Sequence, residues 1–181
     1  YLPTEDGAGS TTPSDPRTKT FTMKNGVAIY GGFAGGETQR SSRNYTNNVT
    51  ILSGDFNNDD NNSASYRTFQ TDATRDDNAY HVVTFPVGCS TTAVLDGFTV
   101  TKGHDLQSGG GGIILDGNNG NTGGTINNCQ LTRCFSETLG GALMLRATGS
   151  GIVVTGAFNN LYFNQNRAMT GGGSSCDYGN G

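Results

Sequence analysis

The chain contains no tryptophan and is poor in charge, in proline and in long hydrophobic runs. Of its 181 residues only 33% are hydrophobic and 14% are charged, and just 4 are proline. So low an apolar content argues against a compact globule with a wide interior. Disordered chains combine low hydrophobicity with high charge, and because the charge is missing here we expect a folded protein.

Further absences exclude several classes of function. No apolar run approaches the roughly 20 residues that span a bilayer, and the N-terminus lacks the basic and then apolar layout of a signal peptide. The net charge of −4 and the scattered Lys and Arg residues leave no basic patch for a nucleic-acid backbone. We therefore expect neither a membrane span nor a nucleic-acid partner.

What the chain has in abundance is glycine, 29 residues, among short apolar runs bounded by Gly, Asn or Asp. Helical periodicity is nearly absent, so these runs predict strands. Three segments align with one another: LDGFTVTKG from Leu95, INNCQLTRC from Ile126 and TGAFNNLYFN from Thr155. A glycine cluster follows each segment. Segments and clusters both recur about every 30 residues, which indicates a stacked repeat.

A repeat of this length with two or three short strands and no helix suits one coil of a parallel β-helix. The predicted fold class is therefore an all-β solenoid. A β-sandwich is the competing fold, but its strands recur without a sequence repeat. Alternate apolar residues of successive coils are expected to stack inward at the strand spacing of ~4.8 Å. The predicted core stack comprises Phe98, Val100, Cys129, Leu131, Phe158 and Leu161.

The two halves of the chain differ in regularity. We expect a single β-helix domain over residues 1–181, with irregular coils in 1–92 and regular repeat coils in 93–181. The irregular half carries a long polar segment, which we interpret as a loop insertion near 55–79. Long loops without strands often carry function.

The glycine clusters contain the residue type of phosphate-binding loops but not the spacing. Neither GxxxxGK[ST] nor GxGxxG between a strand and a helix occurs. We therefore interpret the clusters as corners that need a positive φ or close contact between coils. The predicted corner residues are Gly111, Gly112, Gly140, Gly141, Gly171 and Gly172.

The segment DFNNDDNN is a candidate metal site. Asp55, Asn57 and Asp59 stand at alternate positions. Asp60 follows directly, and the pattern resembles the first half of a calcium-binding loop, whose hard oxygen ligands suit a hard cation. The second half is missing, because position six is not glycine and Tyr66 stands at position twelve. Calcium is the candidate cofactor, and a solvated turn rich in Asp and Asn is the alternative.

Catalytic carboxylates of a β-helix hydrolase would have to share one strand face. The nearest candidates are Asp96, His104, Asp105 and Asp116. The first and last of these precede glycine in LDG, where an aspartate that caps a turn is the ordinary explanation. His81 begins an apolar strand and is interpreted as structural. The pattern favours a protein without catalytic residues.

Four cysteines, Cys89, Cys129, Cys134 and Cys176, form no CxxC pair. Cys129 falls on an inward position, where a free thiol behaves as a small apolar residue. A disulfide such as Cys134 to Cys176 suits an exported protein. Both alternatives stay open.

The ordered series of motifs resembles a known family. KNGVAIYGGFAGGET, NVTILSGD, YHVVTF and AVLDGFTVTKG are followed by glycine-rich coils, which contain GGAL at 140–143 and FNQN at 163–166. This series is similar to bacterial secreted or surface right-handed parallel β-helix proteins related to the polymorphic outer-membrane protein repeats, which carry GGA-[ILV] and FxxN motifs. The resemblance covers residues 18–173, although the other coils depart from the two short motifs.

The resemblance implies a right-handed, single-stranded β-helix that is exported, and family members of this kind act as adhesins, surface layers or passenger regions. It also implies strands before and after the chain, so we expect a part of a longer protein or of an assembly. The predicted function is a non-enzymatic extracellular structural or adhesive module. Its expected partners are further copies, packed head to tail into a filament, or cell-surface glycans. A carbohydrate-active enzyme or carbohydrate-binding module is the alternative.

Overall fold

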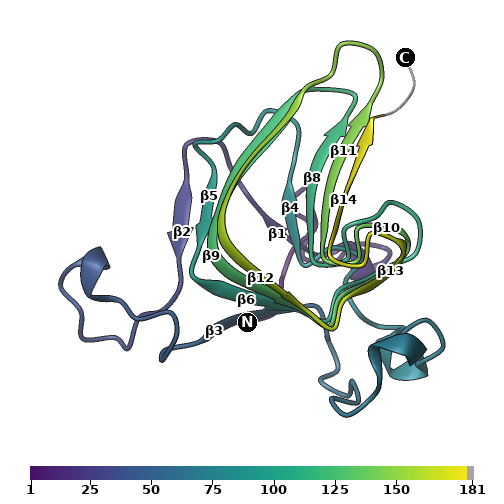
Figure 1. Ribbon diagram of the computed structural model, residues 1–181, viewed down its shortest axis with the longest axis horizontal. Coiled ribbons are helices and arrows are strands. Elements are labelled where there is room, and N and C mark those ends of the chain that lie inside the picture. The colour runs from purple at the N-terminus through teal and green to yellow at the C-terminus, as the bar shows by residue number, and fades with distance from the viewer. Residues whose placement is uncertain (179–181) are drawn as a thin grey trace.

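The computed structural model describes residues 1–178 and consists almost wholly of short parallel strands. Strands of successive coils pair at intervals of about 31 residues. In Figure 1 the chain runs counter-clockwise from β9 through β10 to β11, and the later coils lie nearer the viewer. This path is right-handed, which is the usual sense of a parallel crossover. The predicted parallel β-helix is confirmed.

Three parallel sheets form the walls of the solenoid. Sheet I contains β1 (Phe21–Thr22), β4 (Val83–Phe85), β8 (Ile113–Asn118), β11 (Leu143–Thr148) and β14 (Ser174–Tyr178). Sheet II contains β2 (Ala28–Tyr30), β3 (Thr50–Ser53), β5 (Val94–Asp96), β6 (Phe98–Thr101), β9 (Thr122–Thr132) and β12 (Val154–Asn164). Sheet III contains β7 (His104–Asp105), β10 (Phe135–Leu139) and β13 (Arg167–Thr170).

Apolar side chains that alternate with outward-facing residues fill the interior. In sheet I, Val83, Ile113 and Leu143 occupy one position in three successive coils, and all are buried. In sheet II, Val100 and Leu131 occupy one position in two successive coils, and both are fully buried. Because each large apolar side chain gains about 1.5–3 kcal/mol on full burial, this continuous stack holds the coils together.

The third repeat has a register that differs from the sequence alignment. Phe158 pairs with Ile126, and Leu161 pairs with Cys129, so the alignment of Phe158 with Cys129 is wrong by three residues. The equivalent positions are marked by a bend inside the strand, and the two strands keep a constant offset of 32 residues on both sides of it. Asn128 has a φ of 51°, and the asparagine one coil later has a φ of 53°. The pair NN marks the bend, since each second asparagine adopts the left-handed conformation.

Two insertions interrupt the early part of the chain. Three regular coils make up residues 82–173, and a first coil at 20–53 precedes them. The first insertion, residues 31–49, lies between β2 and β3, and the second insertion, residues 54–79, follows β3. The sequence predicts the second insertion but not the first. The described part of the chain also contains four 3-10 helices: η1 (Pro16–Thr18), η2 (Arg40–Ser42), η3 (Tyr66–Thr68) and η4 (Ala73–Arg75).

The insertions project sideways from the stack. The first lies beside β2 and β3, and the second lies below β10 and β13 in Figure 1. The chain start runs along the first coil, because the Tyr1 ammonium donates to Ile51 and the Ser53 N–H donates to the Tyr1 carbonyl. Among the described residues no helix has the length and apolarity to cross a membrane.

Candidate functional site

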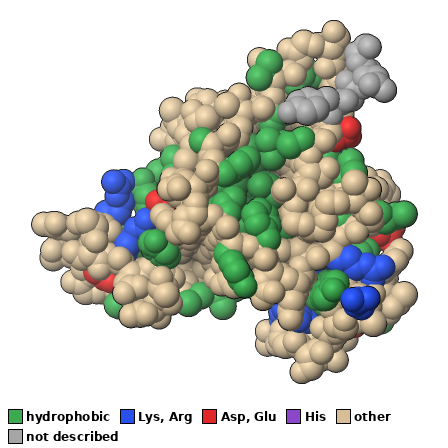
Figure 2. All heavy atoms as spheres, viewed as in Figure 1, with side chains coloured by type: hydrophobic (Ala, Val, Ile, Leu, Met, Phe, Trp, Pro, Cys, Tyr) green, Lys and Arg blue, Asp and Glu red, His purple; other side chains and the backbone are tan. Residues whose placement is uncertain are grey.

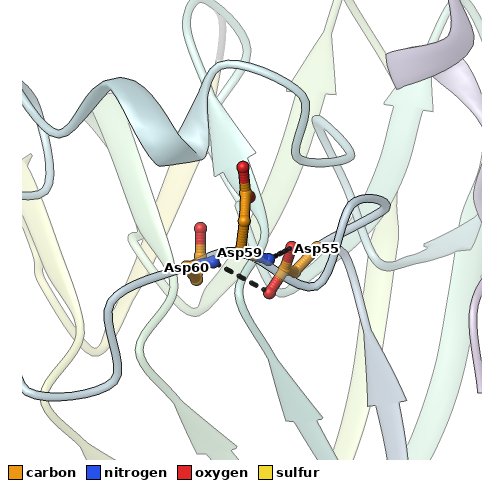
Figure 3. Close-up of side chains that lie close together, drawn as sticks. All are labelled: Asp55, Asp59 and Asp60. Atoms are coloured by element: carbon orange, nitrogen blue, oxygen red, sulfur yellow. Dashed lines mark hydrogen bonds between the residues drawn. The ribbon is translucent and has the colours of Figure 1, made fainter.

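Three carboxylates of the second insertion meet directly after β3 (Figure 3). Oxygen atoms of Asp55, Asp59 and Asp60 lie within 4.8 Å of one another. The buried Asp55 carboxylate accepts hydrogen bonds from the backbone N–H groups of the other two, at 3.2 and 3.3 Å. The backbone N–H of Asn57 donates to Asp77 Oδ2 at 2.8 Å. The structure thus brings together three of the four predicted metal ligands.

Two of these carboxylates already have cationic partners. Lys102 Nζ lies 2.7 Å from Asp55 Oδ2, and an Arg75 nitrogen lies 2.8 Å from Asp60 Oδ2. Desolvation raises the pKa of Asp60, and the charge of Arg75 opposes that rise. A calcium ion would have to displace Lys102 or Arg75, because these side chains supply the positive charge that the ion would bring. Calcium at this cluster stays a prediction.

Arg75 joins the second insertion to the regular coils. Its side chain is almost fully buried, and it donates to the backbone carbonyls of Gly103 and Arg133 at 3.2 and 3.0 Å. The guanidinium also stacks on Phe69, 4.3 Å from the ring centre. A buried ion pair needs such extra hydrogen bonds to offset its desolvation. The cluster that resembles half of a metal loop therefore attaches the insertion to the solenoid.

The candidate catalytic carboxylates lie in different sheets. Asp96 of β5 pairs with Arg43 of the first insertion at 2.7 Å. Asp116 of β8 pairs with Arg146 of β11 at 2.8 Å. Each carboxylate is neutralised by its own arginine, and the two do not face each other across one cleft. The pair of facing carboxyl groups that glycoside cleavage requires is therefore not formed by these residues.

A cleft beside sheet I brings together a histidine and an aspartate that the sequence leaves apart. His81 Nε2 lies 3.9 Å from Asp105 Oδ1 in a cleft of about 360 Å³. The buried Asp105 accepts hydrogen bonds from the backbone N–H groups of 107–109 and from Ser136 Oγ. His81 Nδ1 lies 3.0 Å from the Gly110 carbonyl oxygen, and desolvation lowers the pKa of the imidazole. Ser136 is fully buried and bonds to this carboxylate rather than to His81, and the described contacts contain no hydrogen bond between a serine and a histidine.

His104 lies between the second insertion and sheet III. Its Nδ1 is 2.9 Å from the Arg75 carbonyl oxygen, and its ring meets Phe135 edge to face at 5.0 Å. Burial lowers the pKa of His104 to about 4. The imidazole is therefore neutral at pH 7 and packs as part of the contact between the insertion and the coils.

The glycine clusters lie at the corners between sheets III and I. Gly140 and Gly171 have φ values of 54° and 66°. A Cβ atom added to Gly111 or Gly141 would collide with a backbone carbonyl oxygen of the next coil. Such close approach leaves no room for a phosphate group and serves the corner itself. The same clusters contain the other two predicted corner residues, Gly112 and Gly172.

The residues of the predicted core stack are buried in the earlier coils but not fully in the last coil. Four of its residues are buried, namely Phe98, Val100, Cys129 and Leu131. Leu161 packs partly buried against the core, whereas Phe158 is 41% exposed. All four cysteines are free thiols. Burial raises the pKa of Cys129 and Cys134 to about 11, so these two thiols stay protonated and act as apolar side chains.

The last coil, residues 143–173, presents apolar side chains on the face turned away from the rest of the stack. Hydrophobic atoms gather in the middle of this face in Figure 2. Phe158 and Phe163 occupy positions whose counterparts one coil earlier, Ile126 and Leu131, are fully buried. Among the described residues β12 pairs only with β9, so its other edge has no strand partner. A cleft of about 250 Å³ opens the interior on this face.

The first coil opens the interior on the opposite face. A cleft of about 290 Å³ lies there, and its apolar lining residues are Phe21, Met23, Val27 and Ile29. The start of the chain covers part of this face, because the Thr20 N–H donates to the Glu5 carbonyl at 3.0 Å. The solenoid therefore has two apolar openings, one at each end of the stack.

Comparison with known proteins adds no named relative. The chain matches no protein-family model, no curated protein and no solved structure.

Proposed function

We propose that this chain is a non-enzymatic structural and adhesive β-helix module, which works outside the cell or at the cell surface and packs head to tail with further copies. The observation that carries the proposal is the open face of the last coil. Within residues 1–178, the inward-facing phenylalanines of this coil have no covering coil of the kind that buries their counterparts one coil earlier.

A following coil would stabilise this face in two ways. It would bury Phe158 and Phe163, and full burial of a large apolar side chain contributes about 1.5–3 kcal/mol. It would also pair with the free edge of β12, which is 11 residues long. An unpaired strand edge of this length is a template for another strand.

The first coil of a second copy is the proposed source of that next coil. Its opening is also apolar, with Phe21, Met23 and Ile29 among its lining residues. The contact joins two different faces, so it does not close on itself and extends into a filament or a layer. Tyr1 occupies part of the β3 edge through Ile51. The proposal therefore requires the chain start to shift or to pair with β12.

The pairing of the candidate carboxylates favours a structural role over hydrolysis. Asp96, Asp116 and Asp60 each have an arginine partner within 2.8 Å. A general acid or base must contact the substrate, and each of these carboxylates already contacts an arginine of the protein instead.

Assembly is tested by sedimentation velocity and negative-stain electron microscopy of residues 1–181 over a series of concentrations. We expect particles that lengthen as the concentration rises. Phe163→Lys places a charge on the open face and is expected to leave monomers. Val87→Lys is the matched control, because Val87 is exposed in the turn between β4 and β5 and should leave assembly intact. Wild-type protein that stays monomeric at every concentration would overturn head-to-tail packing, and polysaccharide breakdown by those monomers would favour the enzyme.

A further inference from the structure

A groove lies on the outer face of sheet II, on the side of the solenoid. It has a volume of about 250 Å³. Tyr45 of the first insertion contributes to it beside Gly97 of the first regular coil, and Tyr162 contributes from the last coil. Between them, outward-facing Thr99 and Gln130 stand in the same column of the sheet as Tyr162. The groove therefore runs along the stack, and its side chains repeat at the strand spacing of roughly 4.8 Å.

A ladder of amide side chains forms part of the groove lining. Asn160 Nδ2 donates to Asn128 Oδ1 at 2.9 Å, and Asn128 Nδ2 donates to Asp96 Oδ1 at 2.8 Å. Arg43 in turn holds the Asp96 carboxylate at 2.7 Å. Because each amide is fixed by the previous one, their orientation is set before any ligand arrives.

Several polar groups of the groove remain free for a ligand. Within residues 1–178, the Gln130 amide, the Asn160 Oδ1 atom and the Tyr162 hydroxyl make no hydrogen bond to the protein. Tyr162 is 59% exposed and Tyr45 is 37% exposed. Aromatic rings offer flat apolar surfaces, and side-chain amides both donate and accept hydrogen bonds. This combination suits a ligand that has apolar ring faces and many hydroxyl groups.

The groove lining carries no charge within the described part of the chain. An acidic sugar, a phosphate group or a nucleic acid would find no opposite charge there. The volume lies below the roughly 300–1,000 Å³ of pockets that enclose a drug-sized ligand. The groove therefore fits a few rings of a longer chain that lies along an open surface.

We infer that this groove binds a neutral, extended oligosaccharide along the stack axis. The rings of Tyr45 and Tyr162 stack on sugar rings, and the amides of Gln130 and Asn160 bond to sugar hydroxyls. The inference goes beyond head-to-tail assembly, because one copy contains the whole groove. Where copies do stack, the grooves repeat along the filament and strengthen attachment to a glycan surface by avidity.

Binding is measured by tyrosine fluorescence and titration calorimetry at concentrations where the chain is monomeric. Since tryptophan is absent, the emission comes from the seven tyrosines, of which Tyr45 and Tyr162 line the groove. The signal change that Tyr162→Ala removes is therefore the part that comes from the groove. The probes are hexasaccharides of β-1,4-glucan, β-1,4-mannan and β-1,4-galactan, with the polygalacturonate hexasaccharide as the acidic comparison. We expect saturable millimolar or tighter binding of at least one neutral probe, and about tenfold weaker binding of the acidic one.

Three variants locate the binding site. Tyr162→Ala is expected to weaken binding about fivefold to tenfold. Tyr66→Ala removes a similarly exposed tyrosine from the second insertion and should change nothing. Asn160→Gly removes the amide while it keeps the positive φ of this position, so a loss in this variant identifies the amide rather than the backbone.

Three results would overturn the inference. The first is that no neutral probe binds at millimolar concentration. The second is binding that both Tyr162→Ala and Asn160→Gly leave unchanged, which would place the site elsewhere. The third is equal or tighter binding of the acidic hexasaccharide, which would contradict the ligand class. Head-to-tail assembly is tested by particle size and not by glycan binding. A failure of assembly can therefore be distinguished from each of these three results.

Discussion

The regular coils and the second insertion are held by different forces. Leu131 is fully buried, and it pairs with Val100 of the coil before and with Phe163 of the coil after. The second insertion has no counterpart in a neighbouring coil on which it could stack. It attaches through Arg75, which pairs with Asp60 of the same insertion and donates to the Gly103 and Arg133 carbonyls of the coils. Lys102, in the corner after β6, adds an ion pair with Asp55.

This difference shows that an irregular segment is held to a solenoid by other contacts than those that hold the coils together. Repetition gives each apolar position inside the stack a neighbour above and below, so the coils unfold together. An insertion depends instead on a few directional contacts, and its buried charges are costly when one partner is lost. Damage to the stack should therefore spread through the molecule, whereas damage to the ion pairs should stay local.

The largest expected effect comes from a cavity in the stack. Leu131→Ala is expected to cost about 2–5 kcal/mol in the free energy of unfolding, because the coils on both sides prevent the site from collapsing. Phe163→Ala, at the same position one coil later, should cost well under half as much, since Phe163 is 37% exposed. Urea unfolding followed by circular dichroism at monomeric concentrations measures both values. Equal losses would contradict the difference in burial.

The fold could be predicted because its cause is repeated in the sequence. Apolar positions such as Val100 and Leu131, and glycines such as Gly141, recur once per coil, and only a stack of coils brings such residues into contact. The register of the last coil was harder to predict. Phe158 resembles the first apolar residue of a repeat, but it pairs with Ile126, and the left-handed Asn128 and Asn160 mark the equivalent positions. A comparison based on the NN pairs would have found it.

Only those parts of the candidate sites could be predicted whose residues lie close together in the sequence. The segment around Asp55 indicated a carboxylate cluster, but Lys102 lies 47 positions further along the chain. Whether Lys102 reaches these carboxylates depends on the path of the backbone around the coil, which local spacing does not give. Tyr45 and Tyr162 meet in one groove for the same reason, because the first insertion folds back beside sheet II. No local motif carries either contact.

Acidification should weaken the contact between the second insertion and the coils. Burial lowers the pKa of His104 to about 4 in the folded protein, while the unfolded chain has a pKa of about 6.5. Between these values the unfolded state binds more protons, so stability falls as the pH drops from about 6.5 to about 4. The total from this group is on the order of 3 kcal/mol. The lowered pKa of His81 acts in the same direction.

Asp60 acts in the opposite direction, because its raised pKa lets the folded protein take up a proton first. The net loss in the free energy of unfolding on acidification should therefore be smaller than the contribution of His104 alone. Urea unfolding at pH 7, 5.5 and 4.5 measures it, and His104→Gln removes the titrating ring. A pH dependence in His104→Gln as steep as in the wild type would contradict the assignment.

A smaller effect on overall stability than from the cavity in the stack is expected from Arg75→Met, which leaves Asp60 buried without its cation. If the insertion stayed docked, the loss would be about 3–5 kcal/mol. The insertion can instead detach and hydrate Asp60, so the loss in global unfolding should be limited to about 1–2 kcal/mol. Limited trypsin digestion measures the detachment, because Arg67 lies within the insertion.

Two further variants distinguish the effect of the buried Arg75–Asp60 pair from the effect of losing any ion pair. Arg75→Met with Asp60→Leu removes the stranded charge as well and should regain most of the resistance to trypsin. Arg146→Met breaks the more exposed pair with Asp116 and should cost about 0–1 kcal/mol without faster cleavage at Arg67. If Arg75→Met is cleaved no faster than wild type while the whole chain loses several kcal/mol, the insertion unfolds together with the coils, and its attachment is not local.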